Sequence, residues 1–448
     1  MAANTRSNLV LALALVLASG APWRPAVARA DDAGPGPAPG TTLGKDNCKS
    51  AEGLLPPEIL AHYCKGEYEN PVVEWKGFTF PPDFAASTEK NAGRFDLDAE
   101  GGIVEKATGK QPPRIYGFPF PKIDPSDPKA AAKAVWNYFY MTLSYGNLHA
   151  QSQVNWVGAS SLERRSDQDV HFFYYDGQPE KRSIENPQNF LSQGLIETAA
   201  PADLNGTSAL AWRYRDSNKR DQAWAYVPAL RRARSVSPSN RSDGFLGSDM
   251  SQDDGPFFDG KPEDFTWTFK GEVDGLRFVD AENLKGKFNA KWQESGGWRF
   301  FWPEGKELGY DDPAWKGVAW APIGSAVAKR KFYVVEGVPK DRYYLFGKLE
   351  LWLDKESFQG AWNRKFDWKG ELLNTMQVIA YNLNKATRPD GSEDYIQGSN
   401  LSFQCAENVK MNRSTVAGRK WSPTSALDVM VTYDPKDFTV EALARAGK

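Results

Sequence analysis

The feature that most constrains the fold is a pair of short apolar segments near the middle of the chain, residues 209–214 (ALAWRY) and 223–228 (AWAYVP). Successive side chains of a β-strand point to opposite faces, so each segment is predicted to carry one face of large side chains and one of small ones. Residues 216–221 supply turn-forming chemistry between the segments. An antiparallel pair that is apolar on both faces must be covered on both sides, by helices or by a ligand. The large side chains are Leu210, Trp212, Tyr214, Trp224 and Tyr226.

Alternation with a period of two recurs along much of the chain after residue 150. In one segment, Phe265, Trp267, Phe269 and Val273 are predicted to share a face, opposite polar residues. This pattern is typical of antiparallel sheets with one solvated face. The segments predicted as strands are residues 154–159, 170–175, 209–214, 222–235, 265–273, 331–336, 343–354, 361–368 and 372–382.

Helical periodicity is best defined in residues 128–149, which follow Asp127 as a candidate N-cap, and a short helix is expected at residues 439–446. A parallel α/β fold is disfavoured because helices do not alternate with strands. We therefore predict an α+β fold, in which one large curved antiparallel β-sheet has helices covering its concave face. A single domain with long insertions is expected over residues 44–448.

The N-terminus has the pattern of a secretory signal peptide. An apolar run from Leu9 to Ala18 follows Arg6, and a small-x-small motif ends at Ala30. We predict a signal peptide over residues 1–30, a Pro/Gly-rich disordered linker over residues 31–43, and export to the periplasm. In that oxidising compartment, Cys48 and Cys64 are expected to form a disulfide, and Cys405 to be buried and inert.

Composition and motifs argue against several classes of function. The net charge of −2 gives no indication of nucleic-acid binding. The three histidines, His62, His149 and His171, lack neighbours at the sequence spacing of metal ligands, and each is predicted to be structural, the first two on helices. No nucleophile elbow or phosphate-binding loop is found. We predict no catalytic residues, no metal and no cofactor, although a carboxylate pair for glycoside hydrolysis stays open.

Charged residues cluster where the second apolar segment ends. Arg231 and Arg232 close it, and Asp249 and Asp253 follow in an acidic loop. One interpretation is a loop pinned across the end of the sheet by exposed ion pairs, each contributing about 0–1 kcal/mol. The other is a polar rim at the mouth of an apolar cavity, or a docking patch for a partner.

Several segments together have a familiar pattern: residues 116–128 (YGFPFPKIDPSDP), 224–232 (WAYVPALRR), 245–254 (FLGSDMSQDD), 349–354 (LELWLD) and 438–443 (FTVEAL). On these segments the chain resembles outer-membrane lipoprotein-sorting-like proteins of bacteria, and more closely a related periplasmic family of unassigned function. The resemblance implies a LolA/LolB-like half-barrel that shelters a hydrophobic molecule, and for the closer family an association with exporters of the resistance-nodulation-division type. This chain is longer than a lipoprotein carrier, and its Cys48–Cys64 segment and residues 298–320 have no counterpart there.

The leading hypothesis is a periplasmic carrier for a lipid or another hydrophobic molecule, with an inner-membrane exporter or an outer-membrane protein as partner and no nucleic acid. Arg231, Arg232, Asp249 and Asp253 are candidates for the rim or for pinning the loop. Two alternatives are an envelope protein that binds or cleaves carbohydrate, and a structural or regulatory protein whose core is filled by its own side chains. The candidates for lining the cavity are Trp212, Tyr214, Trp224, Tyr226, Trp267 and Phe269.

Overall fold

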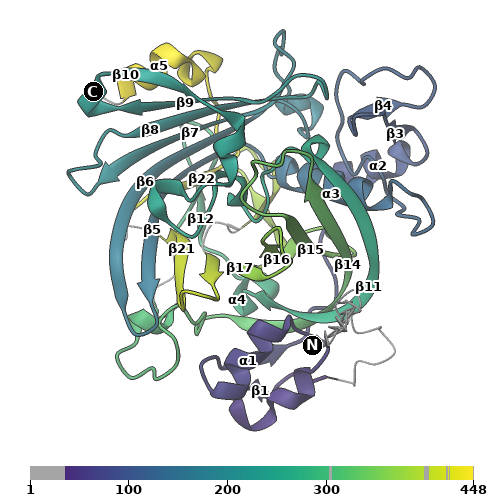
Figure 1. Ribbon diagram of the computed structural model, residues 1–448. Coiled ribbons are helices and arrows are strands. Elements are labelled where there is room, and N and C mark those ends of the chain that lie inside the picture. The colour runs from purple at the N-terminus through teal and green to yellow at the C-terminus, as the bar shows by residue number, and fades with distance from the viewer. Residues whose placement is uncertain (1–35, 302–304, 398–402, 420–421, 423, 447–448) are drawn as a thin grey trace, which may run out of the picture.

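The computed structural model describes residues 36–301, 305–397, 403–419, 422 and 424–446 (Figure 1). The predicted signal peptide and residues 31–35 of the predicted linker lie outside this part of the chain. The last two linker positions, Thr42–Leu43, form strand β1, which pairs with β2 (Asn70–Val73), and Leu43 is fully buried.

One 18-stranded sheet dominates the molecule. Its main path runs through antiparallel neighbours in the order β11, β14, β15, β16, β17, β20, β21, β5, β6, β7, β8, β9, β10. The strands on this path are β5 (Leu148–Gly158), β6 (Leu162–Tyr174), β7 (Phe190–Ala200), β8 (Ser208–Tyr214), β9 (Gln222–Val227), β10 (Arg232–Val236), β11 (Phe265–Val279), β14 (Ala326–Pro339), β15 (Lys348–Asp354), β16 (Gly360–Phe366), β17 (Leu372–Val378), β20 (Gln404–Asn408) and β21 (Arg413–Arg419).

Shorter strands extend this path or stand apart from it. Strand β22 pairs with one end of β5, and β13 and β12 follow from it, while β2 runs parallel to the start of β14. Two small hairpins, β3–β4 and β18–β19, are separate. The bounds are β3 (Phe95–Leu97), β4 (Ile103–Glu105), β12 (Ala290–Trp292), β13 (Trp298–Phe300), β18 (Leu383–Thr387), β19 (Glu393–Gln397) and β22 (Leu427–Val429).

The sheet curves around its contents as an open half-barrel (Figure 1). A β-bulge contributes to this curvature: the register of β11 against β14 shifts between Phe269 and Gly271, which leaves Lys270 without a direct partner. Because of this extra residue, Lys270, side chains two positions apart no longer share a face of β11 across the bulge. The sequence prediction that Val273 shares a face with Phe269 is therefore wrong, because Val273 packs in the cluster around helix α1 and Phe269 packs against the cluster around α3.

Helices lie on both sides of the sheet. Helix α3 is on the inner face, where it packs against β11, β14 and β15. Helix α1 packs on the opposite face of the same strands, and α5 covers the opposite face of the strands at the other end. The α-helices are α1 (Pro57–Lys65), α2 (Pro82–Asn91), α3 (Ala130–Ser144), α4 (Ala281–Leu284) and α5 (Val440–Ala446).

Helix α3 has buried residues on nearly every side, as is typical of a helix that is enclosed by the rest of the protein. The sheet lies on one side of it, and residues 78–123, which include α2 and the β3–β4 hairpin, cover the other. Its buried polar groups find partners there: Asn137 exchanges two hydrogen bonds with the backbone of Phe120, and the Trp136 indole donates to the carbonyl of Gly101 at 2.9 Å. The helix ends at Ser144, earlier than predicted, and His149 therefore lies on strand β5.

The predicted disulfide between Cys48 and Cys64 is present, with a Cα–Cα distance of 5.2 Å. It ties a 3₁₀ helix (Lys45–Ala51) to α1 beneath the sheet (Figure 1). Cys405 on β20 is a free, buried thiol, and burial raises its pKa well above the usual value.

Candidate functional site

A cavity of about 60 Å³ lies between α3 and the inner face of strands β6–β8. Tyr138 and Thr142 of α3 form one wall, and Phe258 also lines the cavity. The opposite wall is made by the sheet itself, through Phe172 and Gly194. A second cavity of about 30 Å³ lies further along α3. A buried water needs about 10–15 Å³ of cavity volume, so the first cavity has room for a few waters or for the end of an apolar chain.

The sheet wall of this cavity continues beyond it as a row of small side chains. Phe172 pairs with Gly194, Gly194 with Ala211, and Ala211 with Ala223 across four adjacent strands, so these side chains share the inner face. A parallel row runs from Ile196 through Ala209 to Ala225. None of these residues is fully buried, and Ala211 is exposed. We call the following set the small-residue floor: Gly194, Ala209, Ala211, Ala223 and Ala225.

The small-residue floor ends at a basic edge. On the last strand of the sheet, β10, Arg232 pairs with Val227 and Arg234 pairs with Ala225. Directly paired residues of antiparallel strands point to the same face, so both arginines are on the side of the small-residue floor. Both are exposed. The inner face of β7–β10 is therefore apolar in its middle and cationic along its free edge.

The other face of these strands carries the large aromatic residues, and it is covered. Phe438 and Leu443, in and just before α5, pack on Leu210 and Tyr226. The Trp212 indole nitrogen donates to the carbonyl of Phe438 at 2.9 Å. The alternation of large and small side chains in the sequence therefore corresponds to one covered and one uncovered face.

The six residues predicted to line a cavity divide between these two faces. Trp212, Tyr214, Trp224 and Tyr226 belong to the aromatic layer under α5 or pack against it. Trp267 and Phe269 are in or against the cluster around α3, on the inner face. The small residues that alternate with these aromatics in the sequence are on the inner face of the sheet, toward the cavity and the uncovered side.

A network of buried charges fixes the segment that follows β10 beneath α3. Arg213, on the inner face of β8, pairs with Asp221 at 2.8 Å and with Asp259 at 2.7 Å. Arg241 pairs with Asp253 at 2.5 Å and with the same Asp221 carboxylate at 3.1 Å. Burial alone would raise the pKa of Asp221, but the two arginines outweigh it and hold that pKa below its usual value. Arg213, Asp221, Arg241 and Asp259 of this network border the cavity.

The charged residues singled out from the sequence have different surroundings. Asp253 pairs with Arg241 and accepts a hydrogen bond from the Tyr344 hydroxyl at 2.9 Å. Asp249 pairs with Arg413 at 3.0 Å and accepts from the Asn408 amide at 2.8 Å. Arg231 and Arg232 are exposed at the β9–β10 turn, where Arg231 has a left-handed backbone conformation (φ 51°). The acidic loop is thus held by Arg241, 12 positions before Asp253, and by Arg413, 164 positions after Asp249.

None of the helices among the described residues is long and apolar enough to span a lipid bilayer.

Comparison with solved structures gives several matches at low sequence identity. An outer membrane lipoprotein-sorting protein domain from Vibrio parahaemolyticus shares 17% sequence identity, over 68% of this chain and 95% of its own, with a TM-score of 0.41. A DUF1329 family protein from Desulfovibrio piger shares 15% sequence identity, over 71% of this chain and 100% of its own, with a TM-score of 0.42. A LolA superfamily protein from Nitrosomonas europaea shares 12% sequence identity, over 69% of this chain and 97% of its own, with a TM-score of 0.38.

A search of curated proteins gave no match. The family model described as "Protein of unknown function (DUF1329)" matches residues 42–291, which is more than half of the chain and contains α3, the small-residue floor and the charge network. The chain therefore belongs to the DUF1329 family.

Proposed function

We propose that this protein is a periplasmic carrier that binds a lipid or another hydrophobic molecule against the small-residue floor. The observation that carries the proposal is the uncovered inner face of β7–β9, where a row of alanines and a glycine lies open beside the cavity under α3. Contiguous exposed apolar surface on a soluble domain usually marks an interaction site.

Small side chains suit this task because they leave space above the sheet for a guest. At Gly194 the Phe172 ring occupies this space, since an added Cβ would be 3.3 Å from the ring, so a guest would lie beside that ring. A long apolar guest would place its end in the 60 Å³ cavity and lie along the small-residue floor. Each methylene that it buries contributes about 0.8 kcal/mol.

The two arginines at the basic edge would orient the proposed guest on the sheet. Arg232 and Arg234 are on the same face as the small-residue floor and in its direct continuation. An apolar molecule with an anionic group at one end would meet both surfaces at once. In this proposal Arg232 keeps the rim role suggested by the sequence, and an exporter of the cell envelope is the partner that supplies or receives the guest.

The test is a fluorescence titration of the tagless protein with dansyl-undecanoic acid. Ala211→Glu places a carboxylate on the small-residue floor, and a bound chain would have to bury it, so we expect the dissociation constant to rise about tenfold or more. The control is Ala229→Glu, at an exposed alanine of the 3₁₀ turn after β9, which should change it less than about twofold. Unchanged binding by Ala211→Glu would place the guest elsewhere.

A second candidate is favoured by the small size of the enclosed space. Cavities of about 60 and 30 Å³ also suit a structural or regulatory protein whose core is filled by its own side chains. The same titration separates the two candidates, because that protein would not bind the probe saturably. Native mass spectrometry of protein purified from the periplasm adds an independent measurement, since a carrier would show an adduct of lipid mass.

A further inference from the structure

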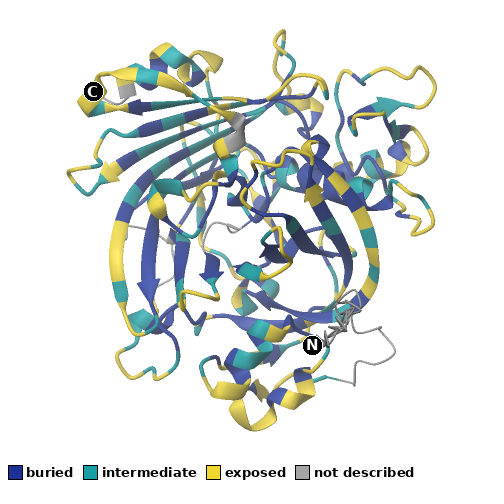
Figure 2. Ribbon diagram, in the orientation of Figure 1, coloured by how far each residue is buried: buried dark blue, intermediate teal, exposed yellow. Residues whose placement is uncertain are grey.

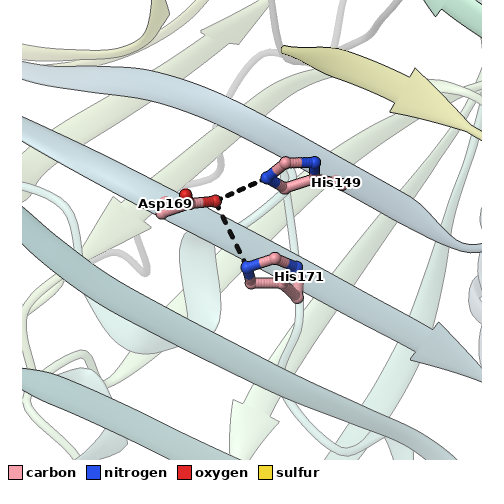
Figure 3. Close-up of side chains that lie close together, drawn as sticks. All are labelled: His149, Asp169 and His171. Carbon is pink, nitrogen blue, oxygen red and sulfur yellow. Dashed lines mark hydrogen bonds and ion pairs between the residues drawn. The ribbon is translucent and has the colours of Figure 1, made fainter. Parts of the chain in front are cut away.

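Two of the three histidines of the chain meet on the face of the sheet opposite the small-residue floor. His149 on β5 and His171 on β6 are direct cross-strand partners, and Asp169 is two residues before His171, so all three side chains emerge on one face (Figure 3). The Nε2 atom of His149 is 2.7 Å from Oδ1 of Asp169, and that of His171 is 3.2 Å from the same oxygen. The two imidazole rings stack with centroids 4.5 Å apart.

The other nitrogen of each ring is also engaged. Nδ1 of His149 is 3.5 Å from Asp428, the residue that pairs with it on β22, and Arg299 holds Asp428 through two hydrogen bonds of 2.7 Å. Nδ1 of His171 is 3.1 Å from the hydroxyl of Tyr433.

The contacts of the two Nδ1 atoms determine whether each Nε2 atom can bind a metal ion. The Tyr433 hydroxyl donates its own proton to the carbonyl of Leu148 at 2.7 Å, so its oxygen is an acceptor for His171. Without an ion, a proton lies between each Nε2 atom and Asp169, because the carboxylate can only accept and two lone pairs would repel at these distances. An ion that binds at Nε2 replaces this proton, while Nδ1 keeps its own proton, which faces Asp428 or Tyr433. Histidine ligands of metal ions are commonly oriented in this way, by a carboxylate or another acceptor at the second nitrogen.

We propose that His149, His171 and Asp169 bind a divalent transition-metal ion, with Zn²⁺ as the best fit to two imidazole nitrogens and one carboxylate oxygen. Ligand atoms about 2.0–2.1 Å from a tetrahedral ion are about 3.3 Å apart. The contact between His171 and Asp169 already has this separation, and the one between His149 and Asp169 must widen by about half an ångström. The stacked rings must also turn about χ2, a soft torsion in histidine, to direct both lone pairs at one ion.

The surroundings of the three side chains favour a cation that is reachable from solvent. Glu197 on β7 is the direct partner of Asp169 and adds a second carboxylate on the same face. The side chains of His149, Asp169 and His171 are 23%, 26% and 22% exposed, so an ion could enter and keep a position for water or an external ligand. The site joins β5 to β6 and, through Asp428 and Tyr433, to the last part of the chain.

The experiment is isothermal titration of ZnCl₂ into the tagless protein after removal of metals with a chelator. We expect one ion per chain, and the double variant His149→Gln/His171→Gln should weaken binding about a hundredfold or more. Asp390→Asn, at an exposed turn between β18 and β19, is the control and should bind as the unchanged protein does. Absence of Zn²⁺ binding by the unchanged protein, or equal binding by the double variant, would overturn the proposal.

A second variant keeps the test decisive if the double variant does not fold. Tyr433→Phe leaves all three ligands in place but removes the acceptor that orients His171, and should weaken Zn²⁺ binding about tenfold. Binding of Co²⁺ gives a further readout, because a tetrahedral site with nitrogen and oxygen ligands produces visible absorption bands. Bands that persist unchanged in His171→Gln would exclude His171 as a ligand and overturn the assignment.

Discussion

The two halves of the sheet have the same strand geometry but differ in how they are covered. Around β14–β16 both faces are buried: Leu351 packs toward α3, Trp352 packs in the cluster around α1, and every residue of β16 is buried. Around β8–β10 one face is covered by α5, and the other carries the small-residue floor and is partly exposed. Figure 2 shows this as a change from mostly buried to mixed colouring along the sheet.

The difference indicates a division of roles within one sheet. Burial of both faces gives the β14–β16 half most of its packing energy, since apolar burial is the main favourable term in folding. The β8–β10 half has an apolar inner face that the described part of the chain leaves partly exposed. Regions with fewer buried contacts are also those that open most easily, as ligand-binding elements must.

The largest effect expected from shortening a side chain concerns the doubly covered half. Trp362 is fully buried on β16, and its indole nitrogen donates to the carbonyl of Leu276 at 3.0 Å. Trp362→Ala should lower the free energy of unfolding by about 4 kcal/mol through the lost burial and the cavity left behind. Trp224→Ala, at a half-buried tryptophan of β9, should cost about 1–2 kcal/mol. Equal costs in urea unfolding would contradict the difference between the halves.

The next effect concerns helix α5 and Phe438, which cover one face of strands β8–β10. Phe438 is buried against Phe173, at a centroid distance of 5.2 Å, and its removal should destabilise the contact of α5 with the sheet by about 3 kcal/mol. We expect Phe438→Ala to speed amide hydrogen exchange in β8–β10 and to leave β14–β16 unchanged. Leu230→Ala, at an exposed residue, is the control and should change stability by less than about 0.5 kcal/mol. Faster exchange throughout the sheet would mean that the halves do not open separately.

A third prediction uses a buried carboxyl just before β11. Burial raises the pKa of Glu263 to about 8, and neither of its carboxyl oxygens has a hydrogen-bond partner among the described residues. In the unfolded chain this group ionises near pH 4.5, so between about pH 4.5 and 8 the folded state holds a proton that the unfolded state has lost, and stability falls as pH rises.

Glu263→Gln removes this loss because the amide does not titrate. Its stability relative to the unchanged protein should rise by up to about 1.4 kcal/mol per pH unit across that window and be constant above it. Thermal unfolding at a series of pH values measures the difference. A constant difference from pH 5 to 8 would mean that Glu263 is not held neutral by burial.

The smallest effect is expected on the small-residue floor itself. Ala225→Val adds two methyl groups on a partly exposed face of a strand, where β-branched residues are favoured, and should change stability by less than about 0.5 kcal/mol. The same change at Ala361, which is buried on β16, should cost about 1–3 kcal/mol by overpacking. A large cost at Ala225 would show that the small-residue floor is filled, and would remove the space proposed for a guest.

Much of the sheet was predictable because strand periodicity is local. The segments around Trp212 and Trp224 form β8 and β9 and pair across the predicted turn. The helix predicted for residues 128–149 was too long, because apolar residues continue from α3 into β5 and a short apolar run does not distinguish the two structures.

The candidate sites were less predictable because the pairing of their side chains depends on the tertiary fold. Asp249 pairs with Arg413, which is 164 positions away, and Asp253 pairs with Arg241, which is 12 positions away, while the sequence drew attention to Arg231 and Arg232. His149 and His171 are separated by 22 positions and meet because β5 and β6 pair in one register, which periodicity alone does not specify.

The sequence by itself determined that the central strands have one large face and one small face, because alternation is a covalent property of an extended chain. Tertiary structure decided which face is covered. Helix α5, more than 200 residues further along the chain than Trp212, packs on the aromatic side, where more apolar area is removed from water. The small side chains are left on the open inner face because they offer least to bury, and they mark where a guest could bind.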